Sequence, residues 1–151
     1  MLISLNASAG LLLASGLTSL TNGRISPAIY TGYDSSTFAL TLTSVGVKNS
    51  IYYQSGYVVS AFSQREAGTF LFRNVRGGLG GGAYLGRKKY QEGSSRQTAT
   101  DVAIGPAMRV TWEMLPDIFL GVESLFGIGG VYQTLVLTTQ RVNILSFGVR
   151  F

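Results

Sequence analysis

The sequence predicts an all-β protein: a transmembrane antiparallel up-and-down β-barrel of about eight strands, formed as a single domain by residues 1–151. The chain has 46% hydrophobic residues and a mean hydropathy of +0.27, yet no run reaches the ~18 apolar residues that a membrane helix requires. Only 13% of the residues are charged, about half the ~25% usual in soluble domains. The apolar residues alternate with small or polar ones, which is typical of strands with one face toward lipid.

The segment 102–114 shows this alternation most clearly. One set of alternate positions is apolar throughout, from Val102 to Met114, and includes Pro106 and Trp112. The other set consists of small or polar residues, among them Arg109 and Glu113. In a membrane barrel the apolar set faces lipid and the polar set faces the interior. The pattern therefore predicts a long strand that turns both charges inward.

The tripeptide Leu115-Pro116-Asp117 predicts a tight turn after this strand. The next strand, 118–128, carries Glu123 on its inward positions, and the last strand, 143–151, carries Arg150 there. If the tripeptide is the centre of a hairpin, Arg109 lies opposite Glu123 on one face. Leaving one partner of a buried ion pair unpaired costs roughly 3–5 kcal/mol. We therefore expect an interior polar network, made of Arg109, Glu113, Glu123 and Arg150.

Five further strands are predicted at residues 1–11, 26–33, 37–47, 51–63 and 68–85. The apolar positions change parity within the last of these, which predicts a β-bulge near Arg73-Asn74. Its glycine run, 77–82, lacks the Lys-Ser/Thr of a phosphate-binding loop, so we expect these glycines to let the strand bend. Short connections are predicted at residues 34–36, 48–50, 64–67 and 115–117, and longer ones at 12–25, 86–97 and 131–141. Short turns are expected at the periplasmic rim, where both chain ends should also lie.

The predicted loop 86–97 is basic. Its cations are Arg87, Lys88, Lys89 and Arg96. A cation beside an anionic membrane surface contributes about 1 kcal/mol to attraction. We expect these side chains to contact anionic lipid, although an ordinary solvated loop would have the same composition.

Aromatic residues fall near both predicted ends of the strands, as the two interfaces of a membrane favour. Those near the periplasmic ends are Tyr33, Phe38, Phe62, Phe70, Trp112, Phe147 and Phe151. Those near the outer ends are Tyr52, Tyr53, Tyr84 and Tyr132.

The C-terminal residues carry a resemblance to a known family. Residues 144–151 alternate and end on Phe151, with Phe147 and Val149 in the same apolar set. This ending resembles the insertion signal of the small Gram-negative outer-membrane β-barrels of the OmpA-transmembrane-domain and OmpX type. The resemblance implies location in a bacterial outer membrane, contact with its lipid and lipopolysaccharide, and recognition by the barrel-assembly machinery. It also implies an export signal, which the N-terminus lacks, so we expect that such a segment was removed.

The residues favour a non-enzymatic role that is structural, adhesive or a scaffold for a partner. The chain has no Cys and no His. The enzymes that this family resembles, lipid A palmitoyltransferases and deacylases and omptin proteases, rely on a His. No cofactor or metal is expected, and the scattered basic residues do not favour nucleic acid, despite a net charge of +5. Two alternatives stay open: a soluble lipocalin-like barrel that binds an apolar ligand inside, and a narrow passive pore.

Overall fold

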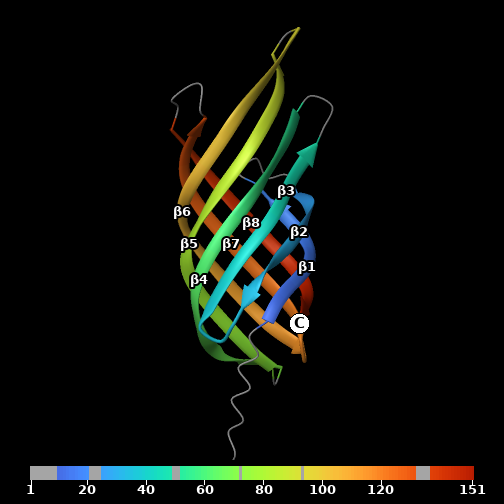
Figure 1. The fold of residues 1–151 in the computed structure, drawn as a ribbon, viewed down its shortest axis with the longest axis vertical. Coiled ribbons are helices and arrows are strands. Elements are labelled where there is room, and N and C mark those ends of the chain that lie inside the picture. Colours follow the sequence, from blue (N-terminus) through green and yellow to red (C-terminus); the bar gives the residue numbers. More distant parts are fainter. Residues whose placement is uncertain (1–9, 21–24, 49–51, 72, 93, 132–136) are drawn as a thin grey trace, which may run out of the picture.

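The structure is a computed structural model and describes residues 10–20, 25–48, 52–71, 73–92, 94–131 and 137–151. Each strand pairs antiparallel with the next in the chain, and the last pairs with the first, so the sheet closes into the predicted eight-stranded barrel (Figure 1). No helix in these ranges is long and apolar enough to span a membrane. The strands are β1 (Gly10–Ser19), β2 (Ile25–Asp34), β3 (Phe38–Lys48), β4 (Tyr52–Phe70), β5 (Arg73–Glu92), β6 (Ser95–Leu115), β7 (Ile118–Val131) and β8 (Leu137–Arg150).

The two faces of the barrel differ as the alternation predicts. On β6, Ile104 is 64% exposed and Met108 is 48% exposed, whereas Ala107 and Arg109 are buried. The same division runs around the ring. Large apolar side chains that face outward include Leu13, Ile29, Leu42, Val59, Leu79, Val110, Val122, Ile128, Leu145 and Phe147. Because an exterior of this kind is apolar, it belongs in a lipid bilayer, and the lipocalin-like alternative, which needs apolar residues inside, is wrong.

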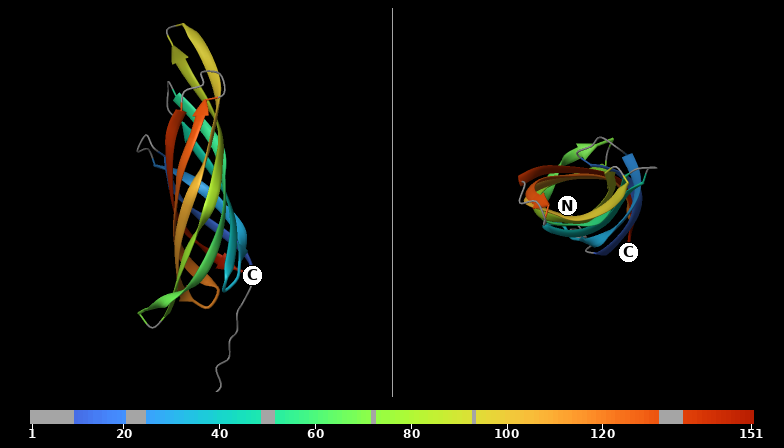
Figure 2. Two further views of the ribbon diagram at one scale, coloured as in Figure 1. Left: turned by 90° about the vertical axis from the view of Figure 1, so that its left-hand side faces the viewer. Right: turned by 90° about the horizontal axis from the view of Figure 1, so that it is seen from above.

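Turns that join β2 to β3, β4 to β5 and β6 to β7 lie at one rim, together with the C-terminus (Figures 1 and 2). The predicted turn at Pro116-Asp117 is confirmed, and Asp117 adopts a positive φ of 64° there. The β5–β6 hairpin rises beyond the rest of the barrel at the opposite rim (Figure 1). Short turns face the periplasm in outer-membrane barrels, and the predicted orientation therefore puts this hairpin on the side away from the periplasm.

The alternation at the two chain ends predicts that residues 143–151 pair antiparallel with residues 3–11, and this closing register is wrong. Strand β8 pairs with residues 12–19 of β1, with Leu13 opposite Val149, and those residues form a strand where a long connection was expected. The backbones of Leu11 and Phe151 also exchange hydrogen bonds, of 3.1 and 2.9 Å. The expected strand at residues 1–9 lies outside the described residues. Phe151 does lie at the short-turn rim, with its side chain 76% exposed.

Two further expectations about the connections are wrong. Residues 64–67 belong to β4, and the basic segment 86–97 is mostly strand, because β4, β5 and β6 are 19 to 21 residues long. The β-bulge lies between Glu66 and Gly68 on β4, not near Arg73-Asn74. The change of parity that suggested a bulge is produced by the β4–β5 turn, where Leu71 has a positive φ of 49°.

The aromatic girdle that was predicted near the periplasmic strand ends is largely present. Tyr33, Phe38, Phe70 and Phe147 are exposed, and Phe70 packs edge-on against Trp112 at a ring distance of 5.2 Å. Two predicted girdle residues are interior instead, because Phe62 and Tyr84 are buried on the inward positions of β4 and β5. The side chains of Tyr52, Tyr53 and Tyr132 lie outside the described residues.

Candidate functional site

A cluster of charged side chains fills the barrel near the short-turn rim, and Asp34 is its centre. Asp34 is the last residue of β2 and follows the inward positions Ala28 and Tyr30, so the strand's alternation turns its carboxylate into the barrel. It is fully buried. A carboxylate buried in this way must be paired or hydrogen-bonded, because its charge is otherwise costly.

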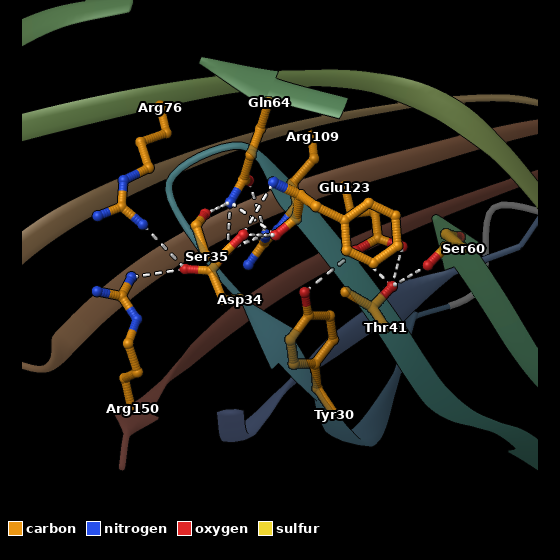
Figure 3. A network of polar contacts seen from close by, with 11 residues as sticks. Tyr30, Asp34, Ser35, Thr41, Ser60, Gln64, Arg76, Arg109, Glu123 and Arg150 are labelled. Carbon is orange, nitrogen blue, oxygen red and sulfur yellow. Dashed lines mark hydrogen bonds and ion pairs between the residues drawn. The ribbon is translucent and has the colours of Figure 1, made fainter. Parts of the chain in front are cut away.

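Three guanidinium groups from three different strands meet this carboxylate (Figure 3). Arg109 on β6 donates to Oδ1 at 2.8 Å, and Arg76 on β5 and Arg150 on β8 donate to Oδ2 at 3.2 and 2.6 Å. Gln64 on β4 donates to Oδ1 at 2.6 Å and accepts from Arg109 at 3.1 Å. We refer to these five residues as the Asp34 cluster. It ties five strands together across the interior and closes that end of the barrel with side chains.

A second polar group lies beside the cluster. Glu123 on β7 is buried and accepts hydrogen bonds from the Tyr30 hydroxyl at 3.3 Å and the Thr41 hydroxyl at 3.0 Å. The ring of Tyr30 lies 6.4 Å from that of Phe119. Together with Phe62, these aromatic rings fill the space around the polar groups.

Arg109 and Glu123 do lie opposite each other in the β6–β7 ladder, as the turn predicted. Yet their side chains pair elsewhere, Arg109 with Asp34 and Glu123 with the two hydroxyls. We expected the two side chains to contact each other or to share a neighbour such as Glu113. Arg109 instead pairs with Asp34, whose carboxylate reaches across the barrel from β2. Glu113 is half-exposed near the β6–β7 turn, where the register shifts. Within the described residues it forms no hydrogen bond to Arg109 or Glu123.

Sequence reasoning missed Asp34 and Gln64 as members of the interior network. It left open whether Arg73 or Arg76 faces inward, and the structure buries Arg76 and exposes Arg73. The sequence pattern places Asp34 in a predicted turn, although its parity continues that of the small and polar positions of β2. Extending the alternation by one residue at the strand's end would have identified it. Gln64 was missed for the same reason, because β4 continues past the predicted turn.

We expect Tyr30→Phe to destabilise the barrel, since it removes one hydroxyl donor from a buried carboxylate. Hydrogen bonds to charged groups contribute about 1.5–3 kcal/mol, and the free energy of unfolding should fall by roughly that amount. Urea titration in lipid vesicles measures it. The matched control is Tyr57→Phe, whose ring is 59% exposed and faces outward. An equal effect of the two changes would contradict a structural role for the Tyr30 hydroxyl.

The four cations that were expected to contact lipid do not share one face. Lys88 turns inward and forms an ion pair with the buried Asp101. Arg87 and Lys89 face outward on β5 and are exposed. The side chain of Arg96 lies outside the described residues.

No family model matches the sequence, and no curated protein matches it. Solved structures do match. Neisserial surface protein A is 22% identical, with a TM-score of 0.58 over 96% of this chain and 97% of that one. Ail, the attachment invasion locus protein of Yersinia pestis, is 12% identical, with a TM-score of 0.57 over 97% and 100%. Ail in complex with the heparin analogue sucrose octasulfate is 14% identical, with a TM-score of 0.52 over 95% and 97%.

These likenesses show the fold, and they extend over nearly the whole chain. The exterior supplies an independent argument, since its band of exposed apolar side chains requires lipid, whereas the charged side chains of the Asp34 cluster are buried in the interior. Closed barrels of this kind span the outer membranes of Gram-negative bacteria. The chain is therefore an eight-stranded transmembrane β-barrel, similar in fold to Neisserial surface protein A and Ail.

Proposed function

We propose that this barrel is a non-enzymatic surface protein of the outer membrane, with a structural or adhesive role, and that it binds the phosphates of lipopolysaccharide through Arg87 and Lys89. The observation that carries the lipid contact is the position of these two residues. On the outward face of β5 they come directly after Leu79, Ala83 and Leu85, all exposed on the same parity.

Alternate positions along a strand lie about 6.6 Å apart, from a rise of roughly 3.3 Å per residue. Arg87 and Lys89 are thus the first and second outward positions beyond the apolar belt on β5. They also lie in the half of β5 away from the β4–β5 turn, opposite Thr100 and Thr98 of β6. Headgroup phosphates of the outer leaflet are expected at that height, and two exposed cations there favour their binding.

An adhesive role is supported by the long β5–β6 hairpin. Its ladder continues beyond the belt as a paired ribbon, from Gly86 opposite Asp101 to Glu92 opposite Ser95. The inward ion pair of Lys88 with Asp101 holds the two strands of this ribbon together. Ail, which has the same fold, has been solved with a sulfated heparin analogue, and a projecting ribbon with outward cations suits a polyanionic ligand.

The double variant Arg87→Gln with Lys89→Gln tests the lipid contact. At about 1 kcal/mol for each cation, its affinity for purified lipopolysaccharide should fall roughly thirtyfold. Binding is measured on the folded barrel in micelles, against phosphorylated and dephosphorylated lipopolysaccharide. The control is Arg65→Gln with Arg73→Gln, which removes two exposed cations near the opposite rim. Equal losses in the two double variants, or a loss that persists with dephosphorylated lipid, would contradict the proposal.

The passive-pore alternative is less favoured by the interior. The Asp34 cluster and the aromatic rings around Glu123 occupy the barrel near the short-turn rim, so a solute would have to displace buried ion pairs. A non-enzymatic role is favoured by the sequence, which has no His. Recognition of Phe147, Val149 and Phe151 by the barrel-assembly machinery remains a prediction. Phe147 and Phe151 face outward, as such a signal requires.

A further inference from the structure

The wall of the barrel is incomplete between β2 and β3. Their ladder begins at the short-turn rim with Asp34 opposite Ala39 and ends at Tyr30 opposite Thr43. Residues 25–29 of β2 and 44–48 of β3 are extended strand, but within the described chain no ladder pair joins them.

This opening lies within the membrane. A transmembrane strand needs about 9–11 residues, and β2 has 10, so all of β2 is required to cross the bilayer. Asp34 lies at the short-turn rim, and residues 25–29 therefore lie in the outer half. Ile25 and Ile29 are 69% and 65% exposed on this stretch, which places the opening among the acyl chains of lipid.

The two free edges are adapted to an apolar surrounding. Unpaired backbone groups are costly in lipid. The amide of Ile29 donates to the Ser44 hydroxyl at 3.1 Å, and this hydroxyl contacts the carbonyl oxygen of Ile29 at 3.4 Å. Both backbone groups of Ile29 therefore point toward β3. The backbone of Pro27, two residues before Ile29, also faces β3, but proline has no N–H that could be left unpaired. On β3, a Cβ added at Gly46 would meet no atom within 4 Å, so the edge is open on that side too.

Behind the opening lies a cavity of about 1290 Å³. Its volume slightly exceeds the range of roughly 300–1,000 Å³ that is usual for ligand sites. Its lining includes outward-facing residues at the opening, such as Pro27, Ile29 and Gly46, and inward-facing residues of six strands, so it extends from the opening into the barrel. The inward-facing residues are small and mostly apolar: Gly16, Ala28, Val45, Gly56, Gly86 and Ser146.

We propose that this cavity binds an acyl chain of an outer-leaflet lipid, which enters laterally between β2 and β3. The opening connects the cavity directly to the acyl-chain region of the membrane, and the small, mostly apolar residues on the inward part of its lining leave room for an unbranched apolar chain. The inference depends on the barrel spanning the membrane and not on the lipopolysaccharide contact of Arg87 and Lys89.

Quenching of a single tryptophan by brominated acyl chains tests the proposal. In a Trp112→Phe background, Val45→Trp places the fluorophore on the cavity wall, and Ala103→Trp places it inside on β6, far from the opening in the strand order. Phosphatidylcholine vesicles with brominated chains should quench Val45→Trp several-fold more than Ala103→Trp, relative to plain vesicles. The outward Leu42→Trp serves as a positive control. A heat-dependent shift on gels verifies that each variant is folded.

Closing the wall provides the second arm. If the β2–β3 register continued, position 27 would face position 46, and the chain has no other cysteine to interfere. In Pro27→Cys with Gly46→Cys, oxidation should reduce the quenching of Val45→Trp to that of Ala103→Trp, and reduction should restore it. The proposal is overturned if Val45→Trp is quenched no more than Ala103→Trp, or mainly by aqueous acrylamide, or equally with the disulfide formed. If the disulfide does not form, the difference in quenching between Val45→Trp and Ala103→Trp decides whether the acyl chain enters the cavity.

Discussion

Replacing Asp34 by asparagine is expected to lower the free energy of unfolding by about 3–5 kcal/mol, the largest effect of any single change in the interior. The carboxylate lies within hydrogen-bond distance of three buried guanidinium groups. Without it, those positive charges repel one another in a space that excludes water. The measurement is urea unfolding in lipid vesicles, followed by the fluorescence of Trp112.

Asp117→Asn is the matched control for this change. It removes the same charge from an exposed turn residue whose φ of 64° asparagine tolerates well. Surface changes of this type are usually within about 0.5 kcal/mol of neutral. Should the two substitutions cost the same, the Asp34 cluster would be solvated and the interior would be more open than the ion pairs indicate.

The second large effect is expected from Met108→Arg on the outer face. Met108 is 48% exposed and lies midway between Ile104 and Trp112 on the outward positions of β6, near the centre of the apolar belt. An arginine at the bilayer midplane of a barrel costs about 2–4 kcal/mol, because the charge must leave water or distort the lipid.

Thr98→Arg places the same charge on the same face of β6, beyond the belt, where the cost falls to about 0–1 kcal/mol. The difference between the two variants therefore measures depth in the membrane. A similar cost at both positions would mean that the apolar belt on β6 does not face lipid.

Sequence reasoning predicted the central strands well for a physical reason. Between Val102 and Met114 one face lies against lipid and the other in a crowded interior, so selection for apolar and polar residues is strict on alternate positions. The adjacent Pro116-Asp117 turn then fixed the β6–β7 register, including Arg109 opposite Glu123.

The same reasoning failed where the two faces of a strand have similar surroundings. Beyond the membrane, in the upper part of β5 and β6, both faces meet water and the sequence resembles a polar loop. In β1 the reverse occurs, since Leu12 is buried inside between the exposed Leu11 and Leu13, and three consecutive leucines conceal the alternation. Strand length could therefore be predicted from the sequence only where the surroundings on the two sides differ.

The site was predicted in part, for a related reason. Parity identified Arg109, Glu123 and Arg150 as interior residues, and the structure buries all three. Which of them pair depends on distances across the barrel, between strands that are not neighbours, such as β2 and β6 in the contact of Asp34 with Arg109. Such distances follow from the tilt and stagger of the closed sheet, which a one-dimensional pattern does not contain.

The seam between β1 and β8 also has a kinetic consequence. Every other ladder joins strands that are consecutive in the chain, so each can form as a local hairpin once its turn is made. The seam instead joins Leu13 to Val149 across nearly the whole chain, and the entropy of closing such a long loop must be overcome before the pairing stabilises it. Folding is thus expected to proceed through an open sheet with two unpaired edges, and closure of the ring is its slow, final event.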